Sequence, residues 1–358
     1  VEHLIVEWSP LPAWARLAEV MPPLGSGRVT RRIIEAEGPE VEAINAGYGR
    51  TFHEWVAKNV GIRRAAAETV LITHQDIMLL PELARSVKGW LESGLAGRTF
   101  GRCDRLDVRM TPDEAMPEEM TIEEAIGRRH RIHARGGSVD CAGEGIATLI
   151  RGASRGRPGD VEQARVILTA YRAGEHDTSL LHTNAAGDFL LARRDDLAAA
   201  GGYAEAFQFR SHMDSFIVYR LWGMGIGQAI FRFPAVAVHV NHAVESPISP
   251  WEEAAPFVDG LLAGEGYPGQ PAEWGLDGVV FEETIVERGG GTRLVSRSEV
   301  EGRLLRADGR ADLEALAMAK DVRLVLERLR VYRADSAKVR IGRDGDGGYI
   351  LPERVLEV

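Results

Sequence analysis

The chain has 358 residues, of which 45% are hydrophobic and 27% charged, and its formal net charge is −10. This composition is typical of a folded protein with one large or two ordinary domains, and it excludes global disorder. The acidic balance argues against a surface built for nucleic acid or anionic lipid. An anionic substrate would therefore have to be bound by a local cluster of basic residues.

Cys103 and Cys141 are the two cysteines of the sequence. Two are too few for a disulfide framework or a four-thiolate zinc site, so we expect free thiols and a reducing compartment. No apolar stretch has the length of a membrane span, and the chain does not open with a basic segment followed by an apolar signal core. We therefore expect a cytoplasmic protein without a membrane span.

The first third of the chain predicts alternating strands and helices. Residues 1–8 and 28–36 read as strands, a glycine-containing loop is expected at 45–50, and a helix at 51–67. Four apolar residues at helical spacing predict the buried face of that helix: Phe52, Trp55, Val56 and Val60. The order strand, helix, strand predicts a right-handed crossover and a mainly parallel sheet in an α/β fold.

An acidic residue follows the next predicted strand. Residues 70–73 form a short apolar run, and Thr73-His74-Gln75-Asp76 brings polar groups directly after it. In open α/β sheets, ligands lie beyond the carboxyl ends of strands, where a carboxylate can hold a hard divalent cation together with diphosphate oxygens and water. Capping of the next turn explains Asp76 equally well.

The middle of the chain is less regular. A helix is predicted at 81–94, a strand of alternating polarity at 98–110, and a variable insertion with some helix at 111–178. His130 and His133 lie among arginines, which favours a solvated basic loop over a metal site.

The second informative region runs from His182 to His242. A turn of small residues at 182–188 precedes an apolar strand, and a helix then stops at 201–202. Asp214 lies near the start of a further helix, where an acid also suits the macrodipole. A last apolar strand at 229–243 carries His239 and His242, which alternate across it, so at most one of them faces a shared site.

Together, these motifs resemble a bacterial group of glycosyltransferase-like proteins with the GT-A fold, similar to family 2. The resemblance covers residues 1–285 and rests on a series of segments in the expected order: EWSP, AKNVGIRRA, ITHQDI, HTNAAGDF, GGY, HMDS, VHVNH and EWGL. It implies a mainly parallel sheet flanked by helices and a nucleotide-sugar donor. It also implies Mn²⁺ or Mg²⁺ and transfer of the sugar to a hydroxyl of a glycan or other acceptor, as in polysaccharide biosynthesis.

The resemblance also implies roles for individual residues. Asp76 matches the last acid of the family's Asp-x-Asp metal motif, whose first acid is replaced by His74, and His239 or His242 matches a late metal-ligating histidine. Asp214 matches the general base of inverting members. The remaining matches are expected near the donor or acceptor: Asn59, Arg63, Thr73, Asn184, Gly187 and Asp188.

Both ends of the sequence depart from a complete domain of this family. Residues 1–8 correspond to what would be the second strand. Residues 286–335 read as a charged linker with an amphipathic helix at 315–333. The tail at 336–358 resembles the opening of methyltransferase-like domains through IGRDGDGGY, although a Gly- and Asp-rich turn explains it equally well.

Two alternatives to a glycosyltransferase remain open. One is a non-catalytic module that binds a nucleotide sugar or carbohydrate within a multidomain protein, which the replacement of the first acid by His74 favours. The other is a scaffold segment of a multidomain enzyme.

Overall fold

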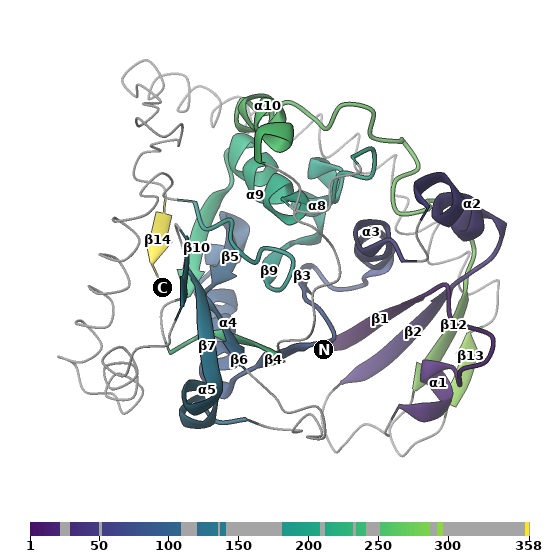
Figure 1. The fold of residues 1–358 in the computed structure, drawn as a ribbon, viewed down its shortest axis with the longest axis horizontal. Coiled ribbons are helices and arrows are strands. Elements are labelled where there is room, and N and C mark those ends of the chain that lie inside the picture. Colours follow the sequence, from purple (N-terminus) through teal and green to yellow (C-terminus); the bar gives the residue numbers. More distant parts are fainter. Residues whose placement is uncertain are drawn as a thin grey trace. The chain divides into compact units, whose positions relative to one another are not determined.

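The structure is a computed structural model, and it describes residues 1–21, 29–49, 52–108, 120–134, 137–140, 181–207, 212–231, 234–240, 251–286, 292–295 and 355–357. These residues form an α/β protein whose strands make three small mixed sheets (Figure 1). The expectation of a single, mainly parallel sheet is therefore wrong. Each of the three sheets contains antiparallel neighbours, for example β4 with β11, β2 with β12 and β5 with β9.

The chain divides into two compact units. The first comprises the described residues of Val1–Val70, Arg194–Phe209 and Glu265–Leu326, and the second those of Leu71–Arg193, Arg210–Gly264 and Glu327–Val358.

A four-stranded sheet forms the centre of the first unit, in the order β1 (Glu2–Trp8), β2 (Thr30–Ala36), β12 (Glu282–Val286) and β13 (Thr292–Val295). β1 and β2 are parallel, whereas β12 is antiparallel to both of its neighbours. Helix α3 (Glu54–Arg64) packs on this sheet through a buried apolar cluster. Its members are Trp8, Ile34, Ala36, Val41, Val56, Ala57, Val60 and Phe281.

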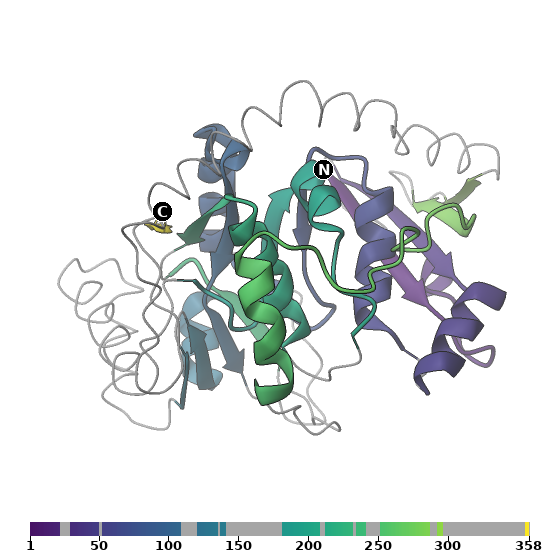
Figure 2. The ribbon, with the colours of Figure 1, turned by 90° about the horizontal axis from the view of Figure 1, so that it is seen from above.

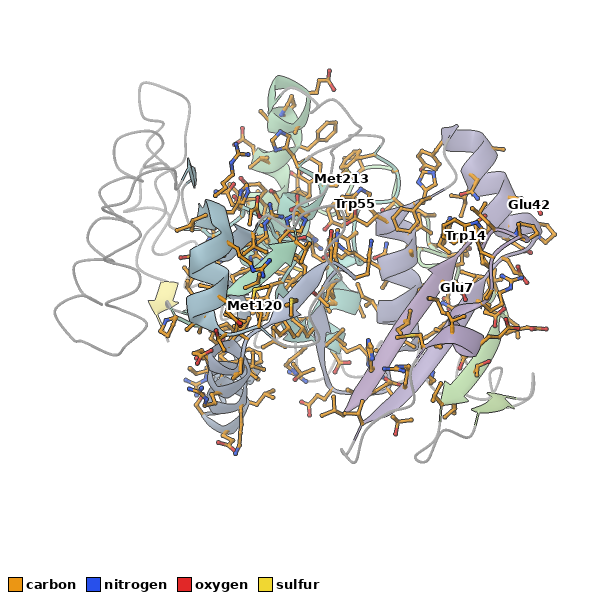
Figure 3. All side chains as sticks on the ribbon, turned by 60° about the horizontal axis from the view of Figure 1, so that its bottom comes forward. Glu7, Trp14, Glu42, Trp55, Met120 and Met213 are labelled. Atoms are coloured by element: carbon orange, nitrogen blue, oxygen red, sulfur yellow. The ribbon has the colours of Figure 1, made fainter. Side chains whose placement is uncertain are left out.

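Three further helices belong to the first unit: α1 (Leu17–Val20), α2 (Pro39–Tyr48) and α8 (Arg194–Ala200). Glu7 on β1 accepts the Leu17 N–H at the start of α1 (Figure 3). The loop expected at 45–50 is instead the end of α2, which stops where Gly49 adopts the left-handed conformation. Phe52 is 52% exposed, so its predicted place in the core is wrong.

The second unit contains two five-stranded sheets. One has the order β14 (Val355–Glu357), β10 (Gly227–Phe231), β5 (Thr99–Cys103), β9 (Leu190–Arg193) and β3 (Thr69–Ile72), the last lying where the chain passes from the first unit into the second. β5 is parallel to β10 and antiparallel to β9. Buried Trp90, Cys103, Phe189 and Phe231 belong to the core beside this sheet.

The other sheet has the order β4 (Ile77–Leu79), β11 (Ala237–Val240), β6 (Arg105–Val108), β7 (Arg129–Ala134) and β8 (Gly137–Asp140). His130 and His133, expected in a solvated basic loop, therefore lie in strand β7. Helix α5 (Ile122–Arg128) precedes β7. A buried apolar cluster forms with this sheet, and it includes Leu106, Val108, Met120, Ile122, Ile132 and Val238 (Met120 is labelled in Figure 3).

Among the described residues, the second unit also contains helices α4 (Pro81–Glu92), α9 (Met213–Gly223) and α10 (Trp251–Leu262) and the 3₁₀ turn η1 (Leu95–Gly97). α9 and α10 run side by side in both ribbon views (Figure 2). Most side chains of α9 are buried, as is typical of a core helix. The backbones of α9 and α10 approach each other closely at Gly223 of α9, where an added Cβ would lie 1.9 Å from the Leu261 carbonyl oxygen.

We expect Gly223→Ala to lower the free energy of unfolding by about 1–3 kcal/mol, because the new methyl group must push the end of α10 away. Urea unfolding measures the change. Gly89→Ala on α4 is the matched control, because its Cβ would meet nothing within 4 Å, and alanine should be neutral or slightly stabilising there. Equal stability of Gly223→Ala and the wild type would contradict the close approach.

Several sequence predictions fall on residues outside the described part: Cys141, His242, most of the insertion at 111–178, the helix at 315–333 and most of the tail at 336–358. Cys103 is a buried free thiol, and burial raises its pKa well above the ordinary range. Within the described residues, none of the helices combines the length and apolar character that a membrane crossing requires.

Candidate functional site

The turn after β3 brings Asp76 beside strand β11. The Ile77 N–H donates to the His74 carbonyl oxygen, and the Val240 N–H donates to the Asp76 carbonyl oxygen at 3.0 Å. The backbone of β4 then continues antiparallel to β11, with Ile77 opposite His239. A short local turn thus fixes an acid predicted from the sequence next to a predicted histidine.

The sheet β4-β11-β6-β7-β8 carries charged and imidazole side chains on the face opposite its apolar core. Arg105 and Asp107 are two residues apart on β6, so they share one face, while Leu106 and Val108 enter the core on the other. The strand register sets His239 of β11 opposite Asp107, and His133 of β7 opposite Arg105. Pairing between strands therefore assembles these four side chains.

These side chains and Asp76 form a continuous set of contacts, which we call the His–Asp cluster: Asp76, Arg105, Asp107, His133 and His239. His239 Nε2 lies 3.2 Å from Asp76 Oδ2, and its Nδ1 lies 3.2 Å from Asp107 Oδ1. His133 Nε2 is 3.1 Å from Asp107 Oδ2, and Arg105 Nε is 2.8 Å from Asp107 Oδ1. The cluster is mostly shielded from solvent, with side chains between 5% and 17% exposed.

In this cluster, attraction between the histidines or arginine and the carboxylates shifts the pKa values more than burial does. Burial opposes the charged form of His239, but hydrogen bonds with Asp107 and Asp76 outweigh burial and raise its pKa to about 9. Burial likewise opposes the charge on Asp76, yet His239 and His74 lower the pKa of Asp76 to about 2. Despite burial, His133, His239 and Arg105 hold the pKa of Asp107 well below its ordinary range. At neutral pH without a bound cation, His239 is an imidazolium between two carboxylates.

This arrangement predicts a pH-dependent stability. Because folding raises the pKa of His239 from 6.5 to about 9, its contribution to the free energy of unfolding is complete below pH 6.5 and is lost as the pH rises through 9. Between pH 6 and pH 9.5, with chelator present, the wild type should lose roughly 3 kcal/mol more than His239→Gln. Urea unfolding at both pH values measures this difference, and equal losses would contradict it.

Buried side chains fix the loop of small residues at 182–188. Arg102, fully buried, donates to three carbonyl oxygens of the loop, those of His182, Asn184 and Ala186. His182 is also fully buried, with Nε2 2.9 Å from Asp104 Oδ1. These hydrogen bonds therefore fix the backbone of the loop from His182 to Ala186, directly before Gly187 and Asp188.

The end of this loop joins the helix of Asp214 to the turn of Asp76. The Gly187 N–H donates to Asp214 Oδ2 at 3.0 Å, and Asp214 Oδ1 accepts the Ser215 N–H at 3.0 Å. The next residue, Asp188, pairs with Arg105, and its Oδ1 lies 3.7 Å from His74 Nδ1. His74 Nδ1 is in turn 4.0 Å from Asp76 Oδ1.

Two backbone outliers lie in the same region. Ala185 in the loop has a φ of 53°, and His212, just before α9, has a φ of 67°. Residues with a side chain adopt this left-handed conformation at a cost, and such strain gathers at functional sites. His212 also accepts the first hydrogen bonds of α9, from the N–H groups of Ser215 and Phe216.

Asn59 and Arg63, predicted near the donor, bind other parts of the first unit. Asn59 is fully buried. Its Nδ2 donates to the Tyr203 carbonyl oxygen and to Glu205 Oε1, and its Oδ1 accepts the Tyr203 N–H. Arg63 lies over the Trp274 ring and donates to the carbonyl oxygens of Trp274 and Ala272. These contacts explain both side chains as packing residues, and their binding role stays a prediction. Thr73, in the second unit, is exposed after β3.

The cluster fits a divalent cation only in part. Asp76 Oδ2 and His239 Nε2 are close enough to share one ion, and of the two ligands the carboxylate oxygen is the one that suits Mn²⁺ or Mg²⁺. Among the residues that the structure describes, no group of three or more His, Cys, Asp or Glu side chains is arranged to hold a metal ion. The protein would thus supply two ligands, which is usual where substrate phosphates and water complete the coordination.

Sequence reasoning missed Arg102, Arg105 and Asp107, and it misread His133. A usable signal exists in residues 102–107, Arg-Cys-Asp-Arg-Leu-Asp, where two arginines and two aspartates interrupt a strand. Charges in a strand that is otherwise buried need partners, so this segment predicts ion pairs with other parts of the chain.

No protein-family model matches the chain, and no curated protein matches it.

Proposed function

We propose that the protein transfers a sugar from a nucleotide-sugar donor to an acceptor hydroxyl, with inversion, at the site formed by the His–Asp cluster and the loop at 182–188. One observation carries this proposal. Continuous contacts lead from Asp76 through His74 and Asp188 to the loop residue Gly187, whose N–H binds Asp214. Two acids distant in the sequence thus belong to one set of contacts.

Asp76 and His239 would hold Mn²⁺ or Mg²⁺. When bound, the cation supplies Lewis-acid stabilisation of the negative charge on the departing diphosphate. Asp214 would act as the general base: it takes the proton of the acceptor hydroxyl while that oxygen bonds to the anomeric carbon and the bond to the diphosphate breaks. Two backbone N–H groups fix the Asp214 carboxylate, and an ionised carboxylate has lone pairs for about two further donors.

The test is release of nucleoside diphosphate from a panel of nucleotide sugars, with Mn²⁺, with Mg²⁺ and with chelator. We expect slow hydrolysis of at least one donor without acceptor and faster release with a suitable acceptor. Binding of a donor by calorimetry without any release would support the alternative of a non-catalytic binding module. Neither binding nor release across uridine, guanosine, thymidine, adenosine and cytidine donors would contradict both.

A further inference from the structure

Asp107 occupies the centre of the His–Asp cluster without being one of the two acids to which the proposed reaction assigns a step. It lies on β6, between β11 and β7 in the sheet. Its Oδ1 contacts Arg105 and His239, and its Oδ2 contacts His133 and Arg105. One carboxylate thus holds three cationic or imidazole groups.

The ring of His239 lies between Asp107 and Asp76, with one ring nitrogen 3.2 Å from each carboxylate. A histidine that binds a metal through one ring nitrogen usually donates the other N–H to a carboxylate, which fixes its tautomer and orientation. With Asp107 on Nδ1, Nε2 is the nitrogen that faces Asp76.

We propose that Asp107 is a positioning residue for the cation site, orienting His239 so that Nε2 and the Asp76 carboxylate can bind one divalent cation. This inference rests on the proposed function for its cation. His133 and Arg105 support it by fixing the carboxylate of Asp107 from its other sides.

The strand architecture explains why this position is fixed. His239 and Asp107 are direct partners in the register of β11 and β6. A shift of one residue would place Leu106 on the polar face and Asp107 in the apolar cluster. The apolar packing of the sheet therefore holds Asp107 opposite His239 whether or not a cation is bound.

The test measures Mn²⁺ binding to the full chain by water-proton relaxation and by loss of the free Mn²⁺ signal in electron paramagnetic resonance. We expect Asp107→Asn to weaken Mn²⁺ binding by about 10- to 100-fold, the usual effect of removing such a partner. Glu283→Gln is the matched control, because it neutralises another buried carboxylate, which pairs with Arg32 in the first unit and belongs neither to the His–Asp cluster nor to the loop at 182–188. It should bind Mn²⁺ like the wild type.

Circular dichroism and thermal melting establish that each variant is folded. Should Asp107→Asn fail to fold, His133→Gln tests the same idea, because it removes the partner of Asp107 Oδ2 and should weaken Mn²⁺ binding in the same direction. Unchanged affinity in a folded Asp107→Asn protein, or unchanged affinity in His133→Gln, would overturn the inference.

The outcomes also separate this inference from the proposed function. If the wild-type protein releases nucleoside diphosphate but binds no Mn²⁺, the proposed role of Asp107 is contradicted. The proposed glycosyl transfer is not contradicted by that result. Wild-type protein that binds Mn²⁺ through Asp107 but turns over no donor would support the cation site and contradict the transferase.

Discussion

The Asp214→Asn variant is expected to lose roughly 10²- to 10⁴-fold in kcat with any nucleotide sugar that the wild type turns over, because the amide cannot take the acceptor proton. Its KM for the donor should change little, since the cluster at Asp76 is untouched. The fold should persist, because the amide oxygen can still accept one of the two backbone N–H groups that the carboxylate binds. Initial rates of nucleoside diphosphate release measure the effect.

Asp259→Asn provides the control for this prediction. Asp259 is an exposed residue of α10 in the same unit, and the same chemical change there should leave kcat near the wild-type value. A folded Asp214→Asn protein with normal turnover would end the assignment of the general base, whatever the control shows.

The Arg102→Met variant is expected to lower the free energy of unfolding by roughly 3–6 kcal/mol. The guanidinium is fully buried and donates to the carbonyl oxygens of His182, Asn184 and Ala186. Methionine fills much of the volume but removes this donor from two buried carbonyl oxygens and one partly buried one, and a buried acceptor left unsatisfied costs about 1–3 kcal/mol. Urea unfolding followed by circular dichroism measures the loss.

Two further variants sharpen the result for Arg102. Arg102→Lys keeps the charge but not the planar fork of donors, so it should recover only part of the stability. Arg98→Met, at an exposed position close to the same strand, should change stability by no more than about 0.5 kcal/mol. Equal effects of Arg102→Met and Arg98→Met would show that the loop does not depend on the buried guanidinium.

Local patterns predicted the elements that local forces determine. The apolar run at 70–73 followed by polar residues indicated a strand that ends before Asp76, and β3 ends at Ile72. The predicted helix at 81–94 corresponds to α4. α2 was missed because its alanine- and glycine-containing end at 45–49 reads as a loop.

Sheet organisation could not be derived in the same way. The predicted strand at 229–243 is two strands, β10 and β11, in different sheets, and Pro234 between them is the local sign of a break. The predicted strand at 98–110 divides in the same way at Asp104, whose carbonyl oxygen accepts the Ala237 N–H. The alternation of apolar and polar residues in these two segments does not indicate with which strands β5, β6, β10 and β11 pair.

The same limit applies to the site. Asp76 and Asp214 stand out because each follows a recognisable local pattern. Asp107 and His133 lie 26 positions apart in the sequence, and their contact forms only when β6 and β7 pair in register. Register depends on the packing of the whole sheet, so a single sequence shows the residues but not their contact.

The most direct test of the central claim is a crystal structure with Mn²⁺ and the nucleoside diphosphate that binds best in calorimetry, using the anomalous signal to locate manganese. We predict manganese between the Asp76 carboxylate, His239 and the diphosphate, with Asp214 facing the space beyond the phosphates. A diphosphate bound elsewhere, with the Asp76–His239 ion pair intact and free of metal, would contradict the account.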